Sequence, residues 1–115
     1  MAKRFDDMIS SSARLSILAP LVPGEAVAFS DLKRESGLAD GNLHVQTGKL
    51  ADVGYVEIRK TRRGRRQVTE YRITELGFER FRLFVRQLEA ILDSEAGVIQ
   101  PVLASERRDD SEVWS

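Results

Sequence analysis

The part of this sequence best suited to chemistry is a run of cationic side chains, which are groups that bind anions. Six of the eight residues from 59 to 66 are basic and none is acidic. The six are Arg59, Lys60, Arg62, Arg63, Arg65 and Arg66. Cations at this density are typical of proteins that bind the phosphates of nucleic acids. A solvated hairpin tip that keeps sheet edges apart is the structural alternative, and six cations exceed what that role needs.

Little else in the sequence offers reaction chemistry. There is no cysteine and one histidine, His44, so disulfides and thiolate metal sites are excluded. A Gly-rich phosphate loop and a paired-histidine metal motif are also missing. We therefore predict no enzymatic activity, no catalytic residue, no metal and no cofactor. His44 is better interpreted as a surface or DNA-facing side chain than as a ligand.

The formal net charge of zero hides two unlike parts of the chain. Residues 93–115 contain six acidic and two basic side chains, a net charge of −4, which leaves +4 on the first 92 residues. The length of 115 residues, with 42% apolar and 31% charged side chains, indicates one globular domain. No apolar run approaches the roughly 20 residues that span a bilayer. No signal peptide is evident, so we expect a cytoplasmic protein without a membrane partner.

Two helices joined by a turn are predicted immediately before the basic run. They follow a first helix over residues 12–21, which Pro20 should end or kink, and one short strand within residues 26–29. The pair covers residues 31–36 and 41–53. The expected capping residues are Ser30, Gly37, Asp40 and Gly54. The 3.6-residue period turns Leu43, Thr47 and Leu50 of the second helix inward.

The basic run itself is predicted to be a loop between two strands. Residues 55–58 and 68–73 alternate between apolar and polar side chains, and Gly64 lies where the chain must reverse. The residues expected to share the buried face are Val56, Ile58, Tyr71 and Ile73. A charged hairpin tip is a more specific feature than a basic tail, because strands hold its cations in place.

The last predicted helix begins after Thr74, its expected N-cap, and carries a wide apolar stripe. The stripe comprises Phe78, Phe81, Phe84, Val85, Leu88, Ile91 and Leu92. It can pack on its own domain, but we favour burial against the same helix of a second copy over residues 75–94. Gly97 and Pro101 are expected to end regular structure, which leaves residues 95–115 as an acidic, flexible tail.

Several motifs together resemble a known family. They are Asp40-Gly41-Asn42-Leu43, Gly54-Tyr55-Val56 and Tyr71-Arg72-Ile73-Thr74-Glu75. Residues 10–92 are similar to the small winged-helix transcriptional regulators related to the MarR and ArsR groups. The resemblance implies an α+β, mainly helical domain with a two- to three-stranded antiparallel wing over residues 59–68. It also implies a homodimer and a recognition helix over residues 41–53. Such regulators carry a His-Leu pair and a basic residue where this chain has Gln46-Thr47 and Gly48.

These features predict a regulator that binds double-stranded DNA as a homodimer and represses by occlusion. The candidates for base contacts are Asn42, His44, Val45, Gln46 and Lys49. The six cations of the wing are the candidates for contacts with the backbone or the minor groove. A small-molecule effector is possible, but no polar group marks a site for one. The alternatives are a protein-interaction module that binds an acidic partner and an RNA-binding domain.

Overall fold

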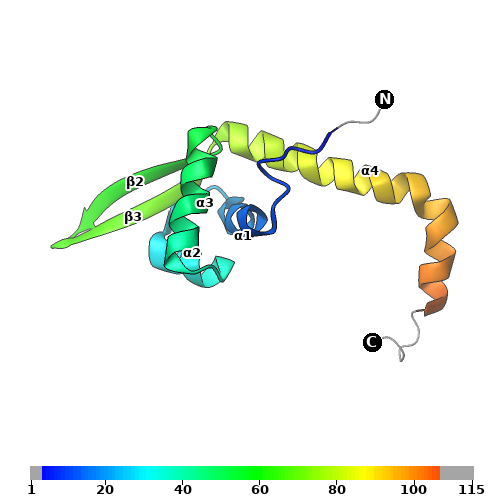
Figure 1. Cartoon of the computed structure of the whole chain (residues 1–115), viewed down its shortest axis with the longest axis horizontal. Coiled ribbons are helices and arrows are strands. Elements are labelled where there is room, and N and C mark those ends of the chain that lie inside the picture. The colour runs from blue at the N-terminus through cyan, green and yellow to red at the C-terminus, as the bar shows by residue number, and fades with distance from the viewer. Residues whose placement is uncertain (1–3, 107–115) are drawn as a thin grey trace. The chain divides into compact units, whose positions relative to one another are not determined.

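The computed structural model describes the backbone of residues 4–106 and the side chains of residues 4–93. Within this part of the chain, four helices and three strands follow one another (Figure 1). They are α1 (Ser12–Leu21), β1 (Val27–Ala28), α2 (Phe29–Ser36), α3 (Asp40–Asp52), β2 (Val56–Arg63), β3 (Arg66–Ile73) and α4 (Glu75–Glu106). The chain divides into two compact units between Phe84 and Val85. The predicted α+β, mainly helical class is confirmed.

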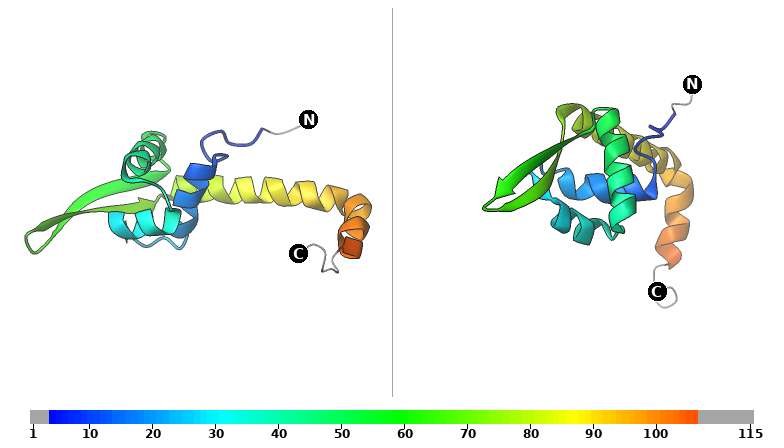
Figure 2. Two further views of the ribbon diagram at one scale, coloured as in Figure 1. Left: turned by 60° about the horizontal axis from the view of Figure 1, so that its bottom comes forward. Right: turned by 60° about the vertical axis from the view of Figure 1, so that its left-hand side comes forward.

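The strands form one antiparallel sheet in the order β1-β3-β2. β2 and β3 pair along their whole length, and their hairpin projects beyond helices α1 to α3 (Figures 1 and 2). The prediction that the basic run is a loop is therefore wrong, because only Gly64 and Arg65 lie outside the strands. Strand pairing satisfies the backbone, and the pleat sends successive cations to opposite faces, which lowers their repulsion.

The core lies between the first three helices and the sheet. Its buried apolar residues are Ile9, Ile17, Leu18, Leu21, Leu32, Leu43, Leu50, Tyr55, Val56, Tyr71, Ile73 and Phe84. Three of the four side chains expected on the buried face of the sheet are therefore confirmed. The expectation for Ile58 is wrong, since 40% of this residue is exposed. Ile58 lies opposite Tyr71, but it belongs to the edge strand, whereas Tyr71 is on the central strand.

The helix boundaries follow the prediction more closely than the caps do. Gly37 ends α2 in the left-handed conformation with φ 74°, as expected. Neither predicted N-cap is correct, because Ser30 and Asp40 lie inside the first turns of α2 and α3. The residues before these turns are Ala28, which is paired to β3, and Ala39. The sheet thus sets the start of α2, and the carboxylate of Asp40 is used in an ion pair instead of a cap.

The segment before α1 is fixed to the domain by side chains. Ile9 is fully buried in the core. The Tyr55 hydroxyl donates a hydrogen bond of 2.5 Å to Oδ2 of Asp6, and Nη1 of Arg80 lies 4.0 Å from the same oxygen. Burial of the Tyr55 phenol and its hydrogen bond to Asp6 raise the pKa of this group. Residues 4–11 are therefore part of the folded unit and can position groups on α1.

The long helix α4 starts at the predicted residue but ends later than predicted. Oγ1 of Thr74 accepts a hydrogen bond of 2.9 Å from the Gly77 amide, which confirms Thr74 as the N-cap. The helix then continues to Glu106, so Gly97 and Pro101 do not end it. An established helix propagates through single unfavourable residues because only its nucleation is costly. Residues 107–115, which include Trp114, lie outside the described residues.

Candidate nucleic-acid interface

The turn between α2 and α3 is held by an ion pair across it. Nζ of Lys33 lies 2.7 Å from Oδ1 of Asp40. The hydrogen bond and the charge of Lys33 hold the pKa of the Asp40 carboxyl below its usual range. The left-handed Gly37 lets the chain reverse between the two partners. The two helices therefore form the predicted helix-turn-helix.

The exposed face of α3 contains most of the residues that are predicted to contact bases. Leu43, Thr47 and Leu50 are buried, as expected. Thr47 is 1% exposed, and its hydroxyl donates to the Leu43 carbonyl at 2.8 Å, so this unusual inward residue leaves no unsatisfied donor. Four of the five predicted base-contact residues are exposed, namely Asn42, His44, Val45 and Lys49. Gln46, the fifth, is half-buried and already bonded.

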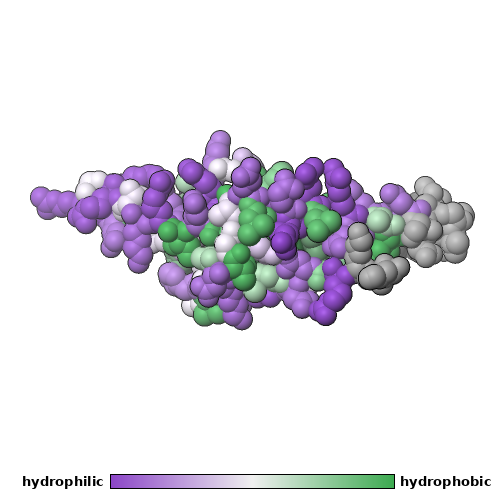
Figure 3. Space-filling view, turned by 90° about the horizontal axis from the view of Figure 1, so that it is seen from above, coloured by the Kyte–Doolittle hydropathy of each residue, from purple (hydrophilic) through white to green (hydrophobic). Residues whose placement is uncertain are grey.

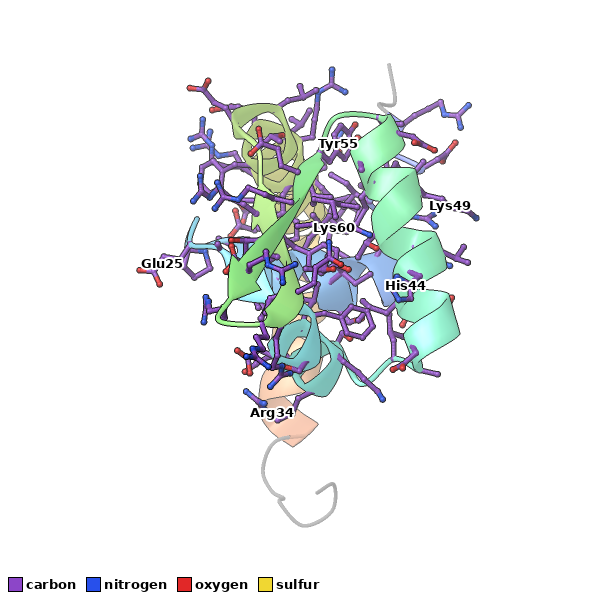
Figure 4. The ribbon with its side chains drawn as sticks, turned by 90° about the vertical axis from the view of Figure 1, so that its left-hand side faces the viewer. Glu25, Arg34, His44, Lys49, Tyr55 and Lys60 are labelled. Carbon is purple, nitrogen blue, oxygen red and sulfur yellow. The ribbon has the colours of Figure 1, made fainter. Side chains whose placement is uncertain are left out.

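His44 is supported by an aromatic contact that the sequence does not reveal. Its ring stacks on Phe29 with centroids 4.7 Å apart and planes 21° from parallel. Both residues line a hollow of about 290 Å³ between the start of α2, α3 and residues 66–69 of β3. Figure 4 shows His44 on α3 near the hairpin and Lys49 directed away from it. The helix therefore presents different side chains toward and away from the wing.

Gln46 and Asn42 are linked to α1 through Arg14. Nη1 of Arg14 donates to Oε1 of Gln46 at 2.7 Å, and Nε2 of Gln46 donates to Oδ1 of Asn42 at 3.0 Å. The sequence analysis assigned no role to Arg14, because the residue is 32 positions from Gln46 and no local pattern links the two. Only the packing of α1 against α3 brings the two together.

The register of the hairpin divides five of the six cations between two faces, and the sixth, Arg65, lies in the turn. Residues directly opposite each other share a face, and the face that continues the core contains Val56, Ile58, Lys60, Arg62, Gln67, Thr69, Tyr71 and Ile73. We call this the inner face. The outer face contains Glu57, Arg59, Thr61, Arg63, Arg66, Val68, Glu70 and Arg72. Figure 4 shows Lys60 on the side of the hairpin toward α3. The inner face is thus the side of the wing that lies next to the candidate recognition helix.

Two cations of the outer face share one acidic partner. Glu70, whose side chain is 11% exposed, lies 3.4 Å from Nη2 of Arg59 and 2.9 Å from Nη2 of Arg63. The other four cations of the run have no ion pair within the described residues; they are Lys60, Arg62, Arg65 and Arg66. Figure 3 shows hydrophilic side chains covering the end of the hairpin. The cations of the run on the inner face are therefore unpaired within the described residues, whereas two of the three on the outer face share Glu70.

The apolar stripe of α4 is partly used within the chain. Phe84 is 6% exposed and belongs to the core, where its ring meets Phe5 edge to face at 5.8 Å. Phe81 packs against the core and Val85 is half-buried. The remaining predicted residues of the stripe are exposed, namely Phe78, Leu88, Ile91 and Leu92. Two further exposed side chains, Leu76 and Leu83, were not predicted. The exposed apolar surface of α4 thus lacks part of the predicted stripe and includes two residues outside it.

The described residues contain neither a candidate metal site nor a candidate membrane span. Among them, no cluster of three His, Cys, Asp or Glu side chains is arranged to hold a metal ion. The helices of this part of the chain are too short or too polar to cross a membrane.

Comparison with known proteins shows which proteins share this architecture. Residues 13–92 match the model of the winged helix DNA-binding domain family. An uncharacterised protein of Methanocaldococcus jannaschii is 33% identical over 81 residues, which cover 70% of this chain and 88% of that protein. A solved transcriptional regulator homologue from Pyrococcus horikoshii OT3 has a TM-score of 0.70 and 29% identity, covering 76% of this chain and 86% of its own.

A putative MarR-family regulator from Porphyromonas gingivalis W83 shares the fold at lower identity. Its TM-score is 0.57 at 17% identity, with coverage of 82% of this chain and 98% of its own. The resemblance found in the sequence is thus confirmed by a family match that covers the helix-turn-helix, the hairpin and the start of α4. The chain belongs to the winged helix DNA-binding domain family.

Proposed function

We propose that this protein is a sequence-specific regulator of transcription that binds double-stranded DNA as a homodimer. The main support is the exposed face of α3 beside a hairpin whose inner face carries Lys60 and Arg62, neither of which has an ion pair with another described residue. In this arrangement α3 enters the major groove, where base pairs differ in their hydrogen-bonding groups. The hairpin contacts phosphates or the adjacent minor groove. Repression by occlusion is proposed because it requires nothing beyond occupation of the DNA.

The proposed roles of the cations differ with their positions. Lys60 and Arg62 on the inner face, together with Arg65 at the turn, are proposed to contact the backbone directly. Arg59 and Arg63 are held by Glu70 and are proposed to act mainly through the local potential. On α3, Val45 is 53% exposed and is proposed to contact an apolar group such as a thymine methyl. Lys49 supplies an additional cation next to the groove.

A binding titration tests this function directly. Fluorescence anisotropy with random duplex DNA at low salt should show binding that weakens steeply as salt is added. The same titration with single-stranded RNA, RNA hairpins and heparin separates the alternatives. Retention on heparin without duplex binding would favour the protein-interaction module, and preference for RNA would favour the RNA-binding alternative. Selection of bound fragments from the genomic DNA of the source would then identify the operator.

The proposed dimer uses exposed apolar residues of α4. Leu88 is 43% exposed and Leu92 is 66% exposed, and side chains of this kind are usually covered by a partner when they recur along a helix. Pairing of two α4 helices would hold two α3 helices for half-sites roughly 34–36 Å apart, about one turn of DNA.

Replacing Leu88 and Leu92 by glutamine should weaken the dimer without unfolding the chain. Four leucines per dimer at about 1 kcal/mol each, a partial-burial value, give about 4 kcal/mol, or roughly a 10³-fold higher dissociation constant. Sedimentation equilibrium measures this change. Val45→Gln likewise replaces an exposed apolar side chain by glutamine, but on α3, and should leave the dimer intact. A double variant that keeps the wild-type dissociation constant would remove this part of α4 from the interface.

A further inference from the structure

The start of α3 is joined to α1 by a chain of hydrogen-bonded side chains. Arg14 donates to Gln46, and Gln46 donates to Asn42, over 2.7 Å and 3.0 Å. Arg14 is itself held by backbone oxygens, since Nε donates to the Met8 carbonyl at 2.5 Å and Nη2 donates to the Asp7 carbonyl at 3.3 Å. Three of its donors are therefore occupied, and the guanidinium has a fixed position beside α3.

The chemistry of arginine determines which group donates and which accepts in each hydrogen bond from Arg14 through Gln46 to Asn42. A guanidinium has only donors, so the atom of the Gln46 amide that faces Arg14 must be its oxygen. The other end of that amide is then the NH₂ group, which requires an acceptor. The Asn42 amide supplies its oxygen and is left with its own NH₂ as the free end. The orientation of both amides thus follows from a residue on another helix.

We propose that this hydrogen-bonded relay from Arg14 through Gln46 to Asn42 makes Asn42 a donor toward DNA. In this relay Gln46 is a positioning residue instead of a base-contact residue. The inference rests on the proposed DNA-binding function. Asn42 is exposed at the third residue of α3, and the N-terminal residues of a recognition helix are the ones that reach base edges. Gln46 is half-buried with both ends of its amide bonded.

The relay also defines what Asn42 recognises. Asparagine reads adenine by accepting from N6 with its oxygen and donating to N7 with its NH₂. Here that oxygen is turned toward Gln46, which occupies one of its two lone pairs. The NH₂ group suits a group that only accepts, which is the O6 and N7 edge of guanine in the major groove or a phosphate oxygen. Guanine and phosphate both offer hydrogen-bond acceptors, but only contact with guanine would depend on the DNA sequence.

The experiment is selection of duplexes from a randomised library by the full chain and by four variants. The variants are Asn42→Ala, Gln46→Ala, Gln46→Glu and the double variant Asn42→Ala/Gln46→Ala. Gln46→Glu can still accept from Arg14 but can no longer donate to Asn42, so it reverses one bond without removing the side chain. Thermal unfolding of each variant confirms that the domain remains folded.

If the acceptor is guanine, the wild-type protein should prefer guanine at one position by roughly 5- to 150-fold, which is the discrimination given by one good base contact. Asn42→Ala should abolish the preference at that position, and both single Gln46 variants should reduce it there and nowhere else. Gln46→Ala should add nothing in the Asn42→Ala background. Replacing the guanine by 7-deazaguanine should reproduce the loss in wild type only.

If the acceptor is a phosphate oxygen, Asn42→Ala and Gln46→Glu should weaken binding to all duplexes equally. A methylphosphonate at one backbone position should then abolish the effect of both variants. The proposal is overturned if Gln46→Ala alters preference at a position of its own, or alters it further when Asn42 is already alanine. It is also overturned if duplexes are selected normally and neither residue matters. Failure of the wild-type chain to select any duplex would instead refute the DNA-binding function.

Discussion

Replacing Lys60 and Arg62 by glutamine is expected to weaken binding to duplex DNA by roughly 10³-fold at 0.1 M salt. Two contacts per chain become four in a dimer, and each phosphate contact changes the slope of log affinity against log salt by about 0.9. The slope should therefore fall by about 3.6 if all four contacts are made. Binding to unrelated sequences should weaken as much as binding to the operator, because phosphates carry no sequence information. Anisotropy titrations at several salt concentrations measure both quantities.

The matched control removes the same charge from the other face of the wing. Arg59 and Arg63 lie on the outer face and are paired with Glu70, so replacing both by glutamine also removes two cations per chain. We expect a much smaller change in slope, because these side chains face away from α3 and already have a counter-charge. Equal losses for the two double variants would show that only total charge matters and would contradict the assignment of the inner face.

Replacing Gly77 by alanine is expected to destabilise the domain by about 2–3 kcal/mol. A Cβ atom at this position would lie 2.1 Å from the Tyr55 carbonyl oxygen and 2.9 Å from its carbon. These are backbone atoms that cannot rotate away. The same oxygen accepts a hydrogen bond of 3.0 Å from the Thr74 amide, so moving it would break the junction between α3, β2 and α4. Urea denaturation followed by circular dichroism measures the loss.

Gly48 provides the control for this substitution. It lies within α3, where an added Cβ meets no described atom within 4 Å apart from the adjoining parts of its own helix. Alanine should therefore raise the unfolding free energy by up to about 1 kcal/mol through its helix propensity. If Gly77→Ala unfolds at the wild-type urea concentration, the close approach of α4 to Tyr55 is refuted. Loss of DNA affinity in the more stable Gly48→Ala would further indicate that the backbone of α3 lies close to DNA there.

The distribution of charge explains how a chain of zero net charge serves as a DNA-binding domain. The acidic side chains of the C-terminal region cancel the basic ones in the total, but they are far from the hairpin in sequence. Within the hairpin, Glu70 reduces the charge of the outer face only. Because fields of exposed charges are screened within about 8–10 Å in salt, we expect the charges of the hairpin itself to govern its contact with phosphates.

The sequence alone determined those features that depend on neighbouring residues. The inward positions Leu43 and Leu50 follow from helical periodicity. The end of α2 at Gly37 and the start of α4 after Thr74 follow from capping chemistry. Together with the order of elements, these local signals were sufficient for the fold class and for the family, because turns and periodic faces are set over a few residues.

Only the tertiary structure decided which side chains meet across elements. The extension of the strands through the basic run depends on pairing between β2 and β3, and it divides the cations into two faces. The bond between Arg14 and Gln46 joins residues 32 positions apart, and the contact of Gly77 with Tyr55 is likewise non-local. No propensity or spacing encodes such contacts, since they arise when separate elements pack. The sequence thus predicted a surface for DNA, and packing determined which side chains on that surface are exposed and which are already bonded.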